Sequence, residues 1–207
     1  MKTTALIPAY NEGKTIAPII SFLKQIPKIA EIVVVDDGSN DNTFQEAVTA
    51  GARVIKLNKN QGKGAALQRG IIEIHSDIIL LLDADLIGLK EIHIDNLLMP
   101  ILNNQADMTV GIFNKGRGLT DLAQLISPYL SGQRAIKMES IKNIYSLEDT
   151  GYGVEVAINK YLKRTGKVKY VELPELTHLL KEEKRGFNQG VQDRVRMYWE
   201  IFRATLR

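Results

Sequence analysis

Two aspartates separated by one residue, Asp83 and Asp85, follow an apolar segment and could bind a divalent cation. If the extended conformation of that segment continues, the two carboxylates point the same way, because side chains on a strand repeat every two residues. Carboxylates on one face repel each other, and a hard cation such as Mg²⁺ or Mn²⁺ relieves the repulsion while it binds substrate phosphates. An Asp-x-Asp pair also occurs in solvated turns, so by itself it leaves both interpretations open.

A second acidic pair, Asp36 and Asp37, precedes Gly38 and Ser39 at the end of another apolar segment. Gly38 permits a tight turn, and an Asp or Ser at this point can cap the helix that follows. A carboxylate at the end of a strand can also accept hydrogen bonds from a ribose hydroxyl or a base N–H. Helix capping explains one acidic residue but not two adjacent ones, which favours a nucleotide-binding role for the pair.

Small residues surround Lys63 at the predicted start of a helix, in the segment Gly62–Ala66. They let the backbone approach a ligand closely, while Lys63 and the helix N-terminus supply positive charge for a phosphate. The spacing matches neither the P-loop nor the dinucleotide-binding glycine pattern. A helix start that uses glycine for packing is the structural alternative.

The elements that position these residues alternate between strands and helices. The hydrophobic pattern predicts strands at Thr3–Pro8, Glu31–Val35, Arg53–Leu57 and Ile78–Leu82, and helices at Lys14–Gln25, Asp41–Ala50 and Gly64–Glu73. Such alternation favours a parallel sheet covered on both faces. Ligands of these sheets bind beyond the carboxyl ends of the strands, and each predicted strand ends in polar or turn residues. We therefore expect all four of these loops to converge on one edge of the sheet.

The pattern is less regular after Asp107. It predicts strands at Asp107–Phe113 and Lys167–Glu172, a turn at Asn114–Gly118, and helices at Gly153–Arg164 and Gly190–Arg207. Seven basic and four acidic residues lie between Lys181 and Arg207, so this segment alone carries a charge of +3. Such a segment suits a solvated helix face, a phosphate site or an anionic membrane surface. For Lys181, Lys184 and Arg185 we favour phosphate contact, because Gly186 and Gly190 give the segment room to move.

Length and composition limit the class of protein. A chain of 207 residues suits one α/β domain, and 44% hydrophobic with 25% charged residues is typical of a globular protein. The absence of cysteine excludes disulfides and thiolate chemistry, and fits a cytoplasmic protein. The apolar runs are too short for a signal peptide or a membrane span. Aromatic residues make up 6%, which offers little stacking surface and disfavours nucleic acid as a partner.

The four loop motifs together resemble the nucleotide-binding half of family 2 glycosyltransferases with the GT-A fold. In chain order they are Pro8-Ala9-Tyr10-Asn11-Glu12, Asp36-Asp37-Gly38-Ser39, Asn60-Gln61-Gly62-Lys63-Gly64-Ala65-Ala66 and Asp83-Ala84-Asp85. The resemblance implies a Rossmann-like α/β fold with three α/β/α layers and a mostly parallel central sheet. It implies a single domain, 1–207, with a nucleotide-binding half at 1–86 and an acceptor-binding half at 87–207. It also implies a nucleotide-sugar donor, with a UDP-sugar favoured, and a Mg²⁺ or Mn²⁺ cofactor.

The same resemblance implies roles for single residues. Pro8, Tyr10 and Glu12 would contact the nucleotide base and ribose. Asp37 would bind the base or the ribose, and Lys63 would bind near the base or the diphosphate. The metal motif would use Asp85 as the main ligand, helped by Asp83, with Ala84 beside the donor.

The second half is similar to a narrower group, the glucosyl-3-phosphoglycerate synthases. The shared segments are Ser131-Gly132-Gln133-Arg134-Ala135, Gly151-Tyr152-Gly153-Val154-Glu155-Val156, and Thr177-His178 followed by basic residues. This similarity implies that Gly132 and Arg185 contact the donor and that Glu155 contacts the donor sugar or the acceptor. It makes His178 the third metal ligand. The group carries Glu where Gln133 stands here, so the acceptor and the stereochemical class stay open.

Taken together, the sequence predicts a metal-dependent glycosyltransferase, a hexosyltransferase, with Asp85, Glu155 and Lys63 as catalytic residues. Its acceptor would be a small phosphorylated or a lipid-linked molecule, and both a homodimer and a peripheral contact with the inner membrane face stay open. One alternative, a sugar-phosphate nucleotidyltransferase, would carry a Gly-rich, Arg-bearing loop after the first strand, where this chain has Pro8–Glu12. A catalytically degenerate nucleotide-binding scaffold is the other alternative, and the intact Asp83 and Asp85 disfavour it.

Overall fold

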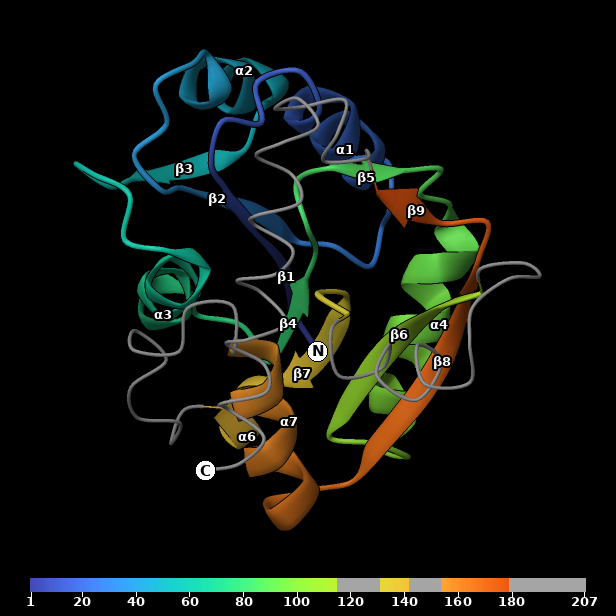
Figure 1. The fold of residues 1–207 in the computed structure, drawn as a ribbon. Coiled ribbons are helices and arrows are strands. Elements are labelled where there is room, and N and C mark those ends of the chain that lie inside the picture. The colour runs from blue at the N-terminus through green and yellow to red at the C-terminus, as the bar shows by residue number, and fades with distance from the viewer. Residues whose placement is uncertain (115–130, 142–153, 179–207) are drawn as a thin grey trace.

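Seven strands form one sheet in the order β3-β2-β1-β4-β7-β6-β8 (Figure 1). The computed structural model describes residues 1–114, 131–141 and 154–178. The strands of the large sheet are β1 (Thr3–Ala9), β2 (Glu31–Asp36), β3 (Arg53–Lys56), β4 (Ile78–Leu81), β6 (Met108–Asn114), β7 (Arg134–Lys137) and β8 (Val168–Pro174). A second, two-stranded sheet pairs β5 (Leu86–Ile87) with β9 (Thr177–His178).

Helices cover both faces of the large sheet. The helices of one face are α1 (Ile16–Leu23), α2 (Thr43–Ala50) and α4 (Glu91–Leu102), and those of the other are α3 (Lys63–Glu73), α6 (Met138–Ile141) and α7 (Val154–Thr165). The side chains of β1 show the division, because Ala5 and Ile7 pack with α1 and α4 while Leu6 packs with α3 and α7. Alternation along a strand buries both faces of β1, as expected for a central parallel strand. The predicted three-layer architecture is confirmed.

The first half matches the predicted order of elements, and every bound lies within two residues of the predicted one. Strands β3, β2, β1 and β4 are parallel. Their register brings Ala9, Asp36 and Lys56 side by side at the carboxyl ends of β1, β2 and β3. The loops that follow these strands therefore start from one edge of the sheet, as expected.

The second half contains elements that the sequence pattern did not predict, namely β5, α4, α6, β7 and β9. The most consequential is β7, which lies between β4 and β6 and runs antiparallel to both. Because Leu81 pairs with Arg134, the residues just before β7 lie at the carboxyl end of β4. Of the predicted turn at Asn114–Gly118, Asn114 belongs to β6 and the rest lies outside the described residues. The predicted helix at Gly190–Arg207 also lies outside them.

No helix in the described ranges is both long and apolar enough to cross a bilayer.

At the edge of the sheet opposite to the loops that follow β1, β2 and β3, Asp107 connects β6, β7 and β8. Its carboxylate accepts a hydrogen bond from Lys167 N at 2.8 Å and forms an ion pair with Lys137 Nζ at 3.1 Å. The Lys167 backbone N–H is the main cause of a lowered pKa for Asp107, and Lys137 adds to the effect against some desolvation. A lowered folded-state pKa means that the ionised carboxylate stabilises the fold at neutral pH.

We expect Asp107→Asn to lower the free energy of unfolding by about 1–2 kcal/mol at pH 7. The ionised Asp107 carboxylate stabilises the fold fully at pH values above the ordinary aspartate pKa of about 3.9. This stabilisation is lost as the pH falls through the lower pKa that Asp107 has in the folded state. Denaturant unfolding of the wild type and of Asp107→Asn at pH 7, 5 and 3 checks this. The difference between their free energies of unfolding should be smallest at pH 3. A gap that stays constant across this range would contradict the assignment.

Candidate active site

The loop after β1 is tied to the loop after β2 by hydrogen bonds. They join Asn11 N to Ser39 Oγ (3.0 Å), Asn40 N to Asn11 Oδ1 (2.9 Å), Glu12 N to Thr43 Oγ1 (2.8 Å) and Gly13 N to Asp41 Oδ2 (3.1 Å). Asn11 has a positive φ of 57°, a conformation that Asn tolerates better than most residues. The predicted nucleotide-binding residues Tyr10 and Glu12 lie partly exposed on this loop, and the partly exposed Pro8 lies near the end of β1. The hydrogen bonds fix the backbone of the loop from Asn11 to Gly13 before any ligand binds.

The two acidic residues at the end of β2, Asp36 within the strand and Asp37 just after it, make different contacts. Asp36 is fully buried and accepts a hydrogen bond from Ser39 N at 3.0 Å, within its own turn. Asp37 instead reaches the loop after β3, where it accepts hydrogen bonds from Asn60 Nδ2 (3.0 Å), Gln61 N (2.8 Å) and Gly62 N (2.8 Å). Burial raises the pKa of Asp37, and the two backbone N–H groups act in the opposite direction. The predicted contact of Asp37 with a base or ribose stays a prediction.

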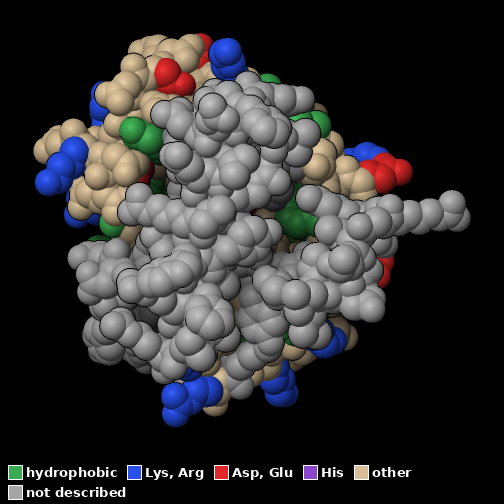
Figure 2. Space-filling model, viewed as in Figure 1, with side chains coloured by type: hydrophobic (Ala, Val, Ile, Leu, Met, Phe, Trp, Pro, Cys, Tyr) green, Lys and Arg blue, Asp and Glu red, His purple; other side chains and the backbone are tan. Residues whose placement is uncertain are grey.

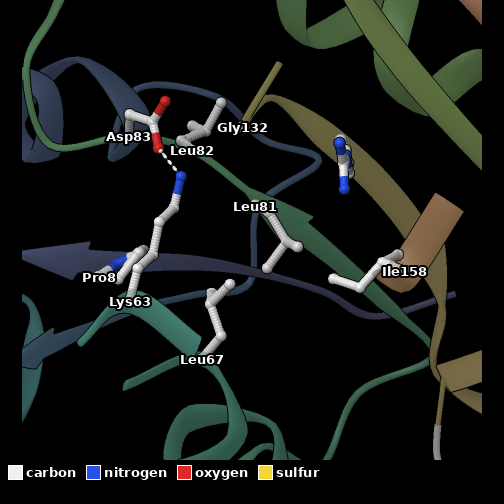
Figure 3. Close-up of a pocket in the computed structure, with 9 residues that line it drawn as sticks. Pro8, Lys63, Leu67, Leu81, Leu82, Asp83, Gly132 and Ile158 are labelled. Atoms are coloured by element: carbon white, nitrogen blue, oxygen red, sulfur yellow. Dashed lines mark hydrogen bonds and ion pairs between the residues drawn. The ribbon is translucent and has the colours of Figure 1, made fainter. Parts of the chain in front are cut away.

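Lys63 is the first residue of α3 and points at the metal motif (Figure 3). Its Nζ lies 2.7 Å from Asp83 Oδ1, and the side chains are 27% and 19% exposed. The ion pair lies on a small cavity whose other lining residues are Pro8, Leu67, Leu81, Leu82, Gly132, Arg134 and Ile158. Three predicted site residues, Pro8, Lys63 and Gly132, thus meet around Asp83.

The segment before β7 holds Asp83 from the other side. Gln133 is fully buried and its Nε2 donates to Asp83 Oδ2 at 2.9 Å. A Cβ on Gly132 would lie 2.4 Å from Asp83 Oδ2 and 2.5 Å from Oδ1, so a larger residue here would force this carboxylate to move. Arg134, also fully buried, donates from Nη2 to Ser131 O at 2.7 Å and supports the same segment.

Sequence reasoning therefore missed a role for Gln133 and Arg134. Gln133 stood out only as a departure from the related synthases, and Arg134 only as part of a shared segment. Their proximity to Asp83 follows from the pairing of β7 with β4, which no local sequence pattern predicted.

The metal motif adopts a turn rather than a continued strand. Strand β4 ends at Leu81, and Ala84 and Asp85 lie in a turn, so the side-chain repeat of a strand does not align Asp83 with Asp85. The next two residues form β5, whose Leu86 pairs with His178 of β9. The backbone of His178 therefore lies opposite the residue that follows Asp85, although 92 positions separate Leu86 from His178 in the sequence (178 − 86).

A buried histidine anchors the chain just before β9. His93 on α4 accepts a hydrogen bond from Lys90 N at Nδ1 (3.1 Å) and donates from Nε2 to Pro174 O (2.8 Å). Both ring nitrogens are used, which explains a fully buried histidine without any catalytic role. Through Pro174 at the end of β8, this contact helps to hold the short segment that leads to His178.

Three predicted site residues have side chains whose placement the structure does not describe. The side chains of His178 and Glu155 lie outside the described atoms, although α7 begins at Val154 and its Ile158 lines the cavity beside Lys63. Arg185 lies outside the described residues. Among the side chains that are described, no group of three His, Cys, Asp or Glu could hold a metal, and the set Asp83, Asp85 and His178 stays a prediction.

Basic side chains of the described residues are scattered around the rim of the face seen in Figure 2, rather than gathered in one area. Lys63, in contrast, points inward to Asp83. The positive charge that the described residues bring to the cavity comes from the Lys63 ammonium group, the buried Arg134 guanidinium and the N-terminus of α3.

Comparison with known sequences identifies the family. The sequence model of Glycosyl transferase family 2 matches residues 4–152, which include all four loop motifs. The chain therefore belongs to glycosyl transferase family 2, as the resemblance implied.

Curated relatives narrow the comparison. Glucosyl-3-phosphoglycerate synthase of Mycobacterium tuberculosis is 26% identical over 193 residues, covering 75% of this chain and 59% of the synthase. A dolichyl-phosphate beta-glucosyltransferase of Trichomonas vaginalis is 42% identical over 98 residues, covering 40% of this chain and 29% of that protein. The chain thus spans less than two thirds of the length of either relative.

A solved structure gives the same fold. The crystal structure of the Mycobacterium tuberculosis synthase in complex with Mn²⁺, UDP-glucose and phosphoglyceric acid has a TM-score of 0.79 at 25% identity. The similarity covers 99% of this chain and 78% of the synthase. The predicted GT-A fold is confirmed.

Proposed function

We propose that the chain is a metal-dependent glycosyltransferase that transfers a sugar from a nucleotide-sugar, with a UDP-sugar favoured, to a phosphate-bearing acceptor. The observation that carries the proposal is the ion pair of Lys63 with Asp83 at the carboxyl edge of the parallel strands. In open α/β sheets this edge is the usual place for a nucleotide ligand. Membership of glycosyl transferase family 2 supports glycosyl transfer as the reaction.

The side chains at this edge fit a hard divalent cation. Mg²⁺ is commonly held by one or two carboxylates together with substrate phosphates, and Asp83 and Asp85 offer such oxygens. As the resemblance to family 2 glycosyltransferases implies, Asp85 would be the main ligand, helped by Asp83, with His178 completing the set. A cation bound there would supply Lewis-acid stabilisation of the leaving diphosphate. The related synthase was solved in complex with Mn²⁺ and UDP-glucose, which supports this assignment.

The chain's own residues position the donor and stabilise charge. Lys63 and the N-terminus of α3 bring positive charge to the place where the diphosphate would bind. Pro8 near the end of β1, with Tyr10 and Glu12 in the loop that follows, would hold the nucleoside. A hydroxyl acceptor attacking with inversion needs a carboxylate base, for which Glu155 and Asp149 are the candidates, whereas a phosphate acceptor is already ionised.

The names of the relatives support a phosphorylated acceptor. One is named for a small phosphate ester, 3-phosphoglycerate, and the other for the lipid-linked dolichyl phosphate. Release of UDP from UDP-glucose, measured with 3-phosphoglycerate and with polyprenyl phosphate in detergent, separates the two. Activity with only one of them assigns the acceptor type, and activity with neither contradicts this part of the proposal.

The experiment that tests the donor site is calorimetric binding of UDP, GDP, UDP-glucose and GDP-mannose, with and without Mn²⁺. We expect binding of one nucleotide type that depends on Mn²⁺ and that Asp85→Ala weakens by about a hundredfold or more, since it removes a metal ligand. Asp77→Ala is a matched control, because Asp77 is an exposed aspartate at the other end of β4 that bonds Lys2 N. Absence of binding to all four ligands would contradict the proposal and favour a degenerate scaffold.

A further inference from the structure

The loop between β3 and α3 is held by a carboxylate that lies more than twenty residues earlier in the chain. Asp37 Oδ1 accepts from Gln61 N, and Oδ2 accepts from Gly62 N and Asn60 Nδ2, at 2.8 to 3.0 Å. An ionised carboxylate offers about four acceptor positions, so the loop uses most of them. Asp37 is only 3% exposed, so its side chain is directed into the protein.

The residue after Asp37 shows independently that the loop must lie close. Gly38 has a φ of +69°, and a Cβ at this position would lie 2.5 Å from Lys59 C and 2.7 Å from Asn60 N. These atoms belong to the backbone, so they cannot rotate away as the end of a side chain could. The loop after β3 therefore rests directly on the turn after β2, and Asp37 and Gly38 together fix its position.

The held loop leads straight into Lys63. Gly62, the N-cap residue of α3, has a φ of +93° and no side chain that caps the helix, and its N–H is one of the two backbone groups that bond Asp37. Lys63 follows as the first helical residue and reaches Asp83. The buried residues of α3 are Gly64, Ala66, Leu67 and Gly70, so packing on the sheet holds the helix, while the loop sets where the chain enters it at Lys63.

From this geometry we infer that Asp37 is a positioning residue, which with Gly38 holds the loop Lys59–Gly62 so that Lys63 is presented to Asp83 and to the donor diphosphate. The inference rests on the proposed function for the donor, and it assigns Asp37 a role different from contact with the base or ribose. A residue that only contacted the base would affect nucleotides and not ligands without a base. A residue that places Lys63 affects every ligand with a diphosphate.

The test compares Mn²⁺-dependent binding of UDP and of inorganic pyrophosphate, which has no base, in the wild type and in Asp37→Asn. The amide of Asn directs an N–H group at the loop donors, so we expect both affinities to fall by a similar factor of about ten or more. In ligand-free protein, hydrogen exchange at the Gln61 and Gly62 amides should accelerate by about tenfold or more, because these bonds protect them. Asn60 lies in the exposed part of the loop, and Asn60→Ala removes only its side-chain bond to Asp37. This variant should weaken ligand binding and accelerate amide exchange as Asp37→Asn does, but by smaller factors.

Asp41→Asn is the matched control, because Asp41 bonds Gly13 and Thr43 and makes no hydrogen bond to the loop Lys59–Gly62. It should leave exchange at Gln61 and Gly62 unchanged. Weaker UDP binding of Asp37→Asn with unchanged pyrophosphate binding and unchanged exchange would overturn the inference and assign Asp37 to the nucleoside. If the wild type binds neither ligand, the proposed donor site fails, while the exchange rates still report whether Asp37 holds the loop.

Discussion

Gly132→Ala should lower kcat/KM by about a hundredfold or more, which is the scale of losing one placed electrostatic group. The added Cβ would lie 2.4 to 2.7 Å from three atoms of the Asp83 carboxyl group, a separation that real structures do not tolerate. Asp83 cannot retreat without leaving Lys63 on one side and Gln133 on the other. We therefore expect the carboxylate to move and the ion pair with Lys63 to be disrupted, while the fold is kept.

The measurement is UDP release from UDP-glucose with the acceptor that the wild type uses, together with a thermal melt. Gly166→Ala is the control substitution, since its Cβ would meet Asp107 Oδ2 at 3.2 Å, at the edge of the sheet far from the site. It should cost some stability and leave kcat/KM near the wild-type value. Wild-type kcat/KM in Gly132→Ala would show that the close contact with Asp83 has no part in catalysis.

Lys63→Met should lower kcat/KM by about a hundredfold to a thousandfold, because it removes the ammonium group expected to stabilise the leaving diphosphate. Methionine keeps most of the length and apolar character of the lysine stem beside Leu67 and Pro8, so packing around the cavity changes little. The ion pair is partly exposed, so we expect the free energy of unfolding to change by no more than about 1 kcal/mol.

Steady-state kinetics with UDP-glucose and denaturant unfolding measure the two effects separately. Lys28→Met provides the comparison, because Lys28 forms an ion pair of similar length and exposure with Asp95, 2.9 Å apart, away from the cavity. That variant should keep the wild-type kcat/KM. A loss of stability in Lys63→Met as large as its loss of transition-state stabilisation would indicate a structural rather than a catalytic lysine.

The first half of the molecule could be predicted from the sequence because its signals are local. Apolar, mostly β-branched runs such as Glu31–Val35 define the buried strands, and helical spacing defines the intervening helices. Polar residues directly after each strand must share an edge once the strands are parallel, since their carboxyl ends point the same way. The convergence of the four motifs therefore followed from periodicity alone, and family membership from the motifs themselves.

The contacts around the metal motif could not be predicted in this way. Strand β7 has four residues with a charged residue at each end, and it is a strand because β4 and β6 pair with it. The hydrogen bond from Gln133 to Asp83 spans 50 positions of the sequence, and the contacts of Asp37 with the Lys63 loop span 23 to 25. The pairing of Leu86 with His178 spans more still.

The sequence by itself thus supplied the candidate residues of the site: two acidic pairs, one lysine at a helix start and the glycines between them. Only the tertiary structure decided what each of them contacts. It turned Asp37 toward the loop, placed Lys63 on Asp83, and brought Gln133 to the same carboxylate through an antiparallel strand. The physical reason is that local periodicity fixes secondary structure, whereas partners far apart in the chain are selected by strand pairing and close packing of the whole fold.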